Sequence, residues 1–136
     1  MQLNGMARWA LLCNVMFSLC CATVMIAGSQ VVAATLVGTG SPDEDVGFTA
    51  VDVVRFIGVG LVLFAGIVAC VATRPQPIRW QVRTISIADF AWVAASAVLV
   101  LGLPDLLVPN GRALVLTVAL IVLGFGIWQW WASRTK

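Results

Sequence analysis

The sequence contains no histidine and no tyrosine, and charged residues make up only 10% of its 136 residues. Histidine is the most common ligand of haem, zinc and copper and the most common general base, so its absence removes the usual centre of metal and acid–base chemistry. The net charge of +2 is too small to indicate a nucleic-acid partner. The sequence therefore predicts no catalytic residue, no metal ligand and no cofactor.

The spacing of the cysteines also gives no indication of a reactive thiol pair. No pair of them has the Cys-x-x-Cys spacing of thiol oxidoreductases. Each lies inside an apolar run, where a thiol packs as a small hydrophobic group. We interpret all four as packing residues, the alternative being a membrane enzyme or redox helper; they are Cys13, Cys20, Cys21 and Cys70.

Apolar residues are what the chain has in abundance. They make up 61% of it, and the mean hydropathy is +1.02. Runs of about 20 apolar residues match the roughly 30 Å hydrocarbon core of a bilayer, whereas a membrane barrel would show short alternating segments. The sequence therefore predicts an all-α membrane protein, with residues 1–136 forming a single four-helix transmembrane bundle in up-down order. The predicted spans are approximately 9–34, 50–73, 85–103 and 113–131.

The first apolar run is longer than one span requires, being uncharged from Trp9 to Pro42. A cleaved signal peptide with a small-residue site at 32–34 is an alternative, but its apolar part would exceed the usual 7–15 residues. We expect one tilted or overhanging span. The following segment 38–47 is rich in glycine and acid; three adjacent carboxylates do not have the spacing of an EF-hand loop, so a solvated loop is expected rather than a cation site.

Local signals set the other boundaries. Thr49 and Asp52 have the spacing of a helix capping pair, and Ser86 and Asp89 repeat it at the third span. The second span is expected to stop before Arg74-Pro75, because proline cannot continue a helix. The turn signal in residues 105–111 predicts a short loop before the fourth span.

The distribution of basic residues predicts an orientation. Six of the eight basic residues fall on one side if both termini and the loop at 74–84 share that side, namely Arg8, Arg74, Arg79, Arg83, Arg134 and Lys136. Because positive charge is retained in the cytoplasm, both termini should be cytoplasmic. The tryptophans favour the same side, since indole rings prefer the headgroup boundary; they are Trp9, Trp80, Trp92, Trp128, Trp130 and Trp131.

Two groups of polar residues are candidates for function. Asp52 and Arg55 are neighbours on one face of the second span, which continues through small residues from Gly58 to Gly66. Because small faces let helices approach closely in lipid, we expect Arg55 to point into the bundle as an ion pair or a snorkelling residue. The alternative is an anion or lipid-headgroup site formed with the outer loop.

The second group lies nearer the cytoplasmic side. Asp89, Trp92 and Ser96 share a face of the third span, and Asn14 and Ser18 lie at similar depth in the first. Asp89 is expected either to pair with a nearby arginine (Arg74, Arg79 or Arg83) or to accept hydrogen bonds from Asn14, because a bare carboxyl is unfavourable near hydrocarbon. Capping and packing form one interpretation; a polar pocket for a lipid or quinone headgroup, or a partner contact, are the others.

Coupled transport is disfavoured on this reading, since the middle of every predicted span lacks ionisable residues. Small multidrug exporters also have four spans, but they carry a glutamate in the first span that this chain lacks. The expected function is that of a non-enzymatic accessory or assembly component of a bacterial inner membrane, surrounded by lipid and associated with itself or with a larger complex. The alternative is binding or transport of a lipid, quinone or other small amphiphile.

Three strings support a family resemblance. They are Asn14-x-x-Phe17-Ser18, Arg55-x-x-Gly58-x-x-Leu61-x-x-Phe64-Ala65, and Asp89-x-x-Trp92-Val93-x-x-Ser96. With them the chain resembles a family of small, uncharacterised four-span bacterial integral membrane proteins over most of residues 9–103. The resemblance implies a compact four-helix membrane bundle and no known activity.

Overall fold

The computed structural model describes residues 5–38, 49–75, 78–103 and 105–134, and within these ranges all regular structure is helical. Four of the five helices are long and apolar enough to cross a membrane, which confirms the predicted all-helical membrane fold at that level. Most of the expected acidic loop lies outside the described residues. The helices are α1 (Gly5–Ala27), α2 (Ser29–Val37), α3 (Ala50–Ala72), α4 (Arg79–Gly102) and α5 (Pro109–Ala132).

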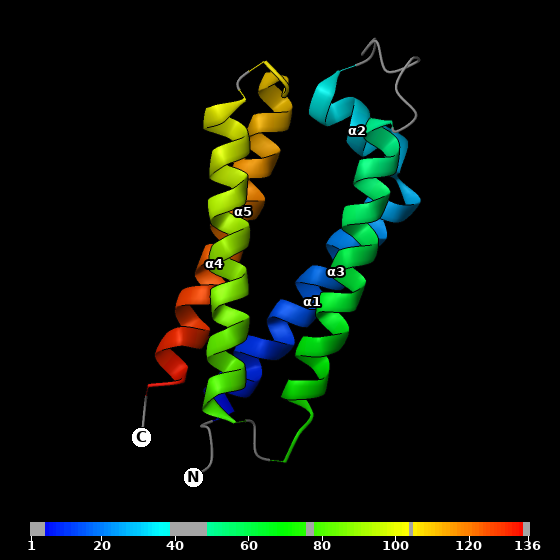
Figure 1. Cartoon of the computed structure of the whole chain (residues 1–136). Helices are drawn as coiled ribbons and strands as arrows, with labels where there is room; N and C mark the ends of the chain where they lie inside the picture. The colour runs from blue at the N-terminus through cyan, green and yellow to red at the C-terminus, as the bar shows by residue number, and fades with distance from the viewer. Residues whose placement is uncertain (1–4, 39–48, 76–77, 104, 135–136) are drawn as a thin grey trace.

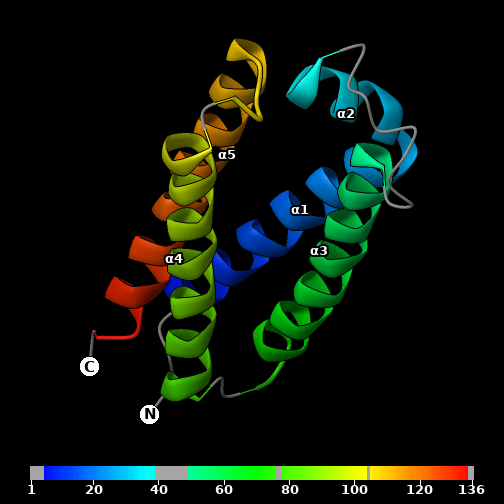
Figure 2. The same cartoon turned by 45° about the horizontal axis from the view of Figure 1, so that its top comes forward.

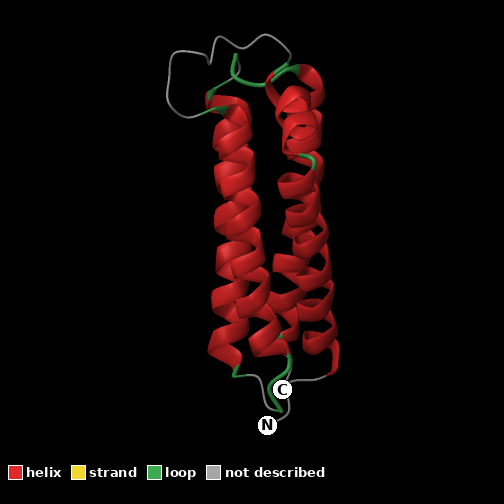
Figure 3. Ribbon diagram, turned by 90° about the vertical axis from the view of Figure 1, so that its right-hand side faces the viewer, coloured by secondary structure: helices red, strands yellow, loops and turns green. Residues whose placement is uncertain are grey.

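The long helices form two pairs, α1 with α3 and α4 with α5. The pairs are joined mainly where α1 packs on α5, while α3 and α4 contact each other very little. Figure 1 shows that the pairs meet at the end where the chain begins and finishes, here called the terminal end, and spread toward the other end. At that other end, here called the α2 end, α2 turns across the bundle, as the rotated view in Figure 2 also shows. Figure 3 shows the bundle from the side, with helices as the regular structure of the described residues.

The expected single span over 9–34 is wrong, because the helix breaks at Gly28. The 23 residues of α1 are already sufficient to cross a bilayer at about 1.5 Å per residue. The remaining apolar residues therefore do not extend the span but fold over as α2, which packs on α3 and α5 and buries Ser29 and Ala33.

The predicted start of α3 is confirmed. The Asp52 amide donates to Thr49 Oγ1 at 3.2 Å, and the Thr49 amide donates back to the Asp52 carboxylate at 3.1 Å. This reciprocal pair satisfies two of the amides that a helix start leaves without partners.

The predicted starts of the last two spans are wrong. Helix α4 begins at Arg79, so Ser86 is a buried interior residue whose hydroxyl donates to Val82 O at 3.2 Å rather than capping a helix. Helix α5 begins with Pro109, whose fixed φ suits the first helical position. Gly111, read from the sequence as part of a turn, is consequently helical.

Gly111 allows α2 and α5 to meet. A Cβ atom at this position would lie 2.7 Å from the Leu36 Cα, a distance that no side chain can occupy. The Val108 amide donates to Leu36 O at 2.9 Å beside this contact. At the α2 end, the backbones of α2 and α5 are therefore in direct contact.

The apolar core lies toward the terminal end, where three helices converge. It combines residues of the first half of α1, the last half of α3 and the first half of α4. This interdigitation holds the two helix pairs together at the terminal end, before they separate toward the α2 end. The core residues are Leu11, Val15, Ala65, Val68, Val71, Ala72, Val82 and Ile85.

Candidate functional site

A buried polar cluster joins three helices within the terminal half of the bundle. Asn14 Nδ2 in α1 donates to Asp89 Oδ2 in α4 at 2.9 Å, and Ser18 Oγ donates to Asn14 Oδ1 at 3.3 Å. Asn14, Ser18 and Asp89 are 1%, 4% and 3% exposed. Of the two arrangements expected for Asp89, the structure holds the one in which Asn14 is the donor.

The cluster lies at one depth in all three helices. Asn14 follows Arg8 by six residues, Asp89 follows Arg83 by six, and Gln129 of α5 precedes Arg134 by five. At about 1.5 Å per residue, these polar groups lie roughly 8–9 Å beyond the basic residues. Asp89 is the eleventh of the 24 residues of α4. The expectation that the middle of every span lacks ionisable residues is therefore wrong. It assumed that the third span begins near residue 85, whereas α4 begins at Arg79.

Gln129 is the member of the cluster that sequence reasoning missed. Its side chain is fully buried, and neither Oε1 nor Nε2 completes a hydrogen bond, although the amide lies close enough to the Asp89 carboxyl to interact with it. One turn earlier, a Cβ at Gly126 would lie 3.4 Å from Asp89 Cβ and 2.9 Å from the Phe90 ring. Glycine at 126 thus brings α5 against α4 beside Asp89. A glutamine at the end of the apolar run that begins after Thr117 was the available signal.

The other predicted members of this group are used differently. Ser96 is buried, but its hydroxyl donates to Trp92 O at 2.9 Å, one turn back in the same helix. Trp92 itself is partly buried. The structure therefore brings Asn14, Ser18 and Asp89 together, whereas Ser96 satisfies its own polar group locally.

Arg55 does not point into the bundle as expected. It is exposed, and its Nε donates to Ser29 Oγ of α2 at 3.0 Å, while Asp52 is engaged by Thr49 in the capping box. The predicted small-residue face beyond it is also wrong. Gly58 is buried against Ile26, but Gly66 has open space around it, because the buried line of α3 follows a different face. That line is Val54, Gly58, Ala65, Val68, Val71 and Ala72.

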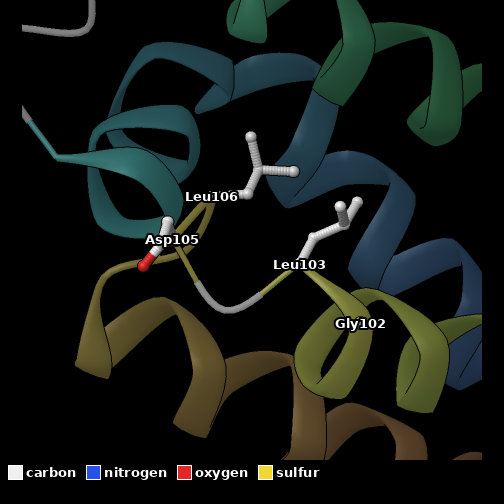
Figure 4. A pocket seen from close by; sticks show the side chains of 4 residues that line it. All are labelled: Gly102, Leu103, Asp105 and Leu106. Atoms are coloured by element: carbon white, nitrogen blue, oxygen red, sulfur yellow. The ribbon is translucent and has the colours of Figure 1, made fainter.

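The hollows on the surface lie away from the polar cluster. An open pocket of about 390 Å³ is lined by the end of α4 and the segment that follows it. Figure 4 shows the four lining residues, with the Leu103 and Leu106 side chains turned to one side and the Asp105 carboxyl turned to the other. A groove of about 350 Å³ runs along α1 and is lined by Met16, Leu19, Cys20, Thr23 and Val24. Both are lined mainly by apolar side chains, which suits acyl chains of lipid.

Among the described residues, no three histidine, cysteine or acidic side chains gather closely enough to hold a metal ion. The four cysteines are free thiols, with Cys20 and Cys70 exposed and the other two partly buried. Comparisons with protein-family models, with curated proteins and with solved structures found no match for this chain.

Proposed function

We propose that the chain is a non-enzymatic integral membrane protein that associates with itself or with a larger membrane complex. The observation that carries this proposal is the open edge of the bundle. In a four-helix bundle each helix packs on two neighbours, but α3 and α4 contact each other little apart from the residues that they share in the apolar core. Both helices expose large apolar side chains, including Phe56, Leu63, Val98 and Leu101. A helix of a second chain at this edge would complete the packing.

The chain supplies exposed thiols on two of its helices as probes of association. Cys70 is exposed on α3, whereas Cys20 is exposed on α1 in the groove described above. Two variants that each retain one of these thiols would be treated with a short bis-maleimide in native membranes. Association through α3 predicts dimers or partner adducts through Cys70 and not through Cys20.

Native mass spectrometry of gently extracted protein provides the second measurement. A homo-oligomer or a stoichiometric protein partner supports the proposal. A solitary monomer, together with equal cross-linking at the two thiols, would contradict it.

The family resemblance and the orientation belong to the same proposal. We propose up-down order of the four spans in a bacterial inner membrane, with the terminal end in the cytoplasm. Six of the eight basic residues are in segments at that end, and the exposed Trp9, Trp80 and Trp131 are at the corresponding ends of their helices. Reporter fusions at the C-terminus check this, since a reporter active only in the periplasm should remain silent.

A second candidate function is favoured by the unpaired Gln129 amide beside Asp89. Ionisable residues inside a membrane mark ligand pathways more often than structural sites, and a buried unpaired amide can receive a polar group of a ligand. On this hypothesis the cluster binds the headgroup of a quinone or other small amphiphile. Asp89→Asn and Gln129→Leu should then each remove a co-purifying small molecule, whereas Ser96→Ala should retain it. Retention in all three variants would eliminate this candidate.

A further inference from the structure

Two arginines, one in α4 and one just after the end of α5, converge on one indole ring at the terminal end. The Arg83 guanidinium carbon lies 5.7 Å from the Trp130 ring centre, and that of Arg134 lies 5.4 Å from the same centre. Trp130 is itself held by the Phe90 ring, whose centre is 6.5 Å away in an edge-on arrangement. Attraction to the indole orients both guanidiniums, but it does not neutralise their charge.

The described residues at the terminal end provide no acidic side chain to neutralise this pair. Residues 5–13, 69–75, 78–88 and 127–134 contain no aspartate or glutamate. The nearest acid in α4 is Asp89, which is buried and accepts a hydrogen bond from Asn14. Two like charges held near one ring repel each other, and an anion bound between them would relieve this repulsion.

The position of the pair indicates where that anion comes from. Trp131 is 72% exposed next to Trp130, and Trp80 is 62% exposed one turn before Arg83. Exposed indoles of this kind lie at the boundary between hydrocarbon and headgroups. Both arginines are exposed at this same level, where lipid phosphates are concentrated.

We propose that Arg83, Trp130 and Arg134 form a binding site for the phosphate headgroup of one anionic glycerophospholipid in the leaflet at the terminal end. The guanidiniums donate paired hydrogen bonds to the phosphate oxygens, a geometry that suits arginine better than lysine. The indole fixes the two side chains before the lipid arrives, which reduces the entropy lost on binding. This site goes beyond the proposed association and uses none of its residues.

The test uses the full chain and two lipids with identical acyl chains, phosphatidylglycerol and phosphatidylcholine. Native mass spectrometry should show one phosphatidylglycerol retained in preference to phosphatidylcholine. The variant Arg83→Gln/Arg134→Gln should lose roughly thirtyfold in affinity for phosphatidylglycerol, and Arg134→Gln alone roughly fivefold. Arg134 follows the end of α5, so the single variant remains informative if the double variant folds poorly.

The matched control is Arg8→Gln/Arg74→Gln, which removes the same charge from the same end away from Trp130. It should retain most of the preference. An equal loss in the two double variants would mean diffuse attraction and overturn the site, as would an absence of preference in the unmodified chain. Displacement of the lipid by millimolar inorganic phosphate would show a site for soluble anions and would also overturn the proposal.

Discussion

The two ends of the bundle are held together by different kinds of interaction, side-chain packing at one end and mainly backbone contacts at the other. At the terminal end, side chains from three helices interdigitate around an apolar core, and Asn14 and Asp89 join the helix pairs through a buried hydrogen bond. At the α2 end, the contacts are a backbone hydrogen bond to Leu36, the close approach at Gly111, and the bond from Arg55 to Ser29. Because hydrogen bonds are stronger where water is excluded, the terminal end should dominate stability, and the α2 end should determine local shape.

The largest expected effect is at the polar cluster. Asn14→Leu leaves the Asp89 carboxyl without its donor and should lower the free energy of unfolding by about 3 kcal/mol. Unfolding in mixed micelles measures this change. The control is Gln129→Leu, which should cost less than Asn14→Leu because the Gln129 amide interacts with the Asp89 carboxyl without completing a hydrogen bond. Equal losses of stability in the two variants would contradict the expected difference between Asn14, which completes a hydrogen bond to Asp89, and Gln129, which does not.

A backbone clash should separate α2 from α5. Gly111→Ala places a Cβ against the Leu36 backbone, which cannot move aside as a flexible side chain would, and should destabilise the contact by about 2 kcal/mol. Hydrogen exchange should accelerate in α2 and remain unchanged around Leu11 and Val68. Faster exchange throughout the protein would mean that the two ends unfold together, contrary to the comparison.

Two glycines of α5 form a matched pair for close helix packing. Gly126→Ala meets the Phe90 ring and should destabilise by about 1–2 kcal/mol, whereas Gly124→Ala meets nothing within 4 Å and should gain up to about 1 kcal/mol from helix propensity. In α3, Gly58→Ala would place a Cβ 2.8 Å from Ile26 Cγ1 and 3.2 Å from Met25 Cβ, so its cost should be similar to that of Gly126→Ala. Thermal unfolding of the three variants ranks them. A Gly126→Ala variant as stable as Gly124→Ala would contradict the close α4–α5 approach.

The smallest effect is expected at the start of α3. Thr49→Ala removes the hydroxyl of the capping box and should reduce stability by about 1 kcal/mol. The loss should appear as faster amide exchange in the first turn of α3 with no change in α4 or α5. Thr117→Ala is the control, because the Thr117 hydroxyl bonds only to Ala113 O within its own helix.

The candidate site was half predictable. Asn14, Ser18 and Asp89 could be found because each is a polar residue inside an apolar run, and similar depth suggested their meeting. Gln129 could not be placed, since nothing local indicates that α5 packs on α4 through Gly126. The capping role given to Asp89 failed because the spacing of Ser86 and Asp89 also occurs inside a helix, where it caps nothing.

By itself the sequence determined the class of the protein and the number of long apolar helices, because hydrophobic length and scarce charge are local properties measured against a bilayer. It also determined the start of α3, since a capping box satisfies amides within four residues. Only the tertiary structure decided that residues 29–37 fold across the bundle, that α3 and α4 remain apart, and that Arg55 bonds to α2. These outcomes depend on which helix faces meet, and that choice is made by packing between segments distant in the chain.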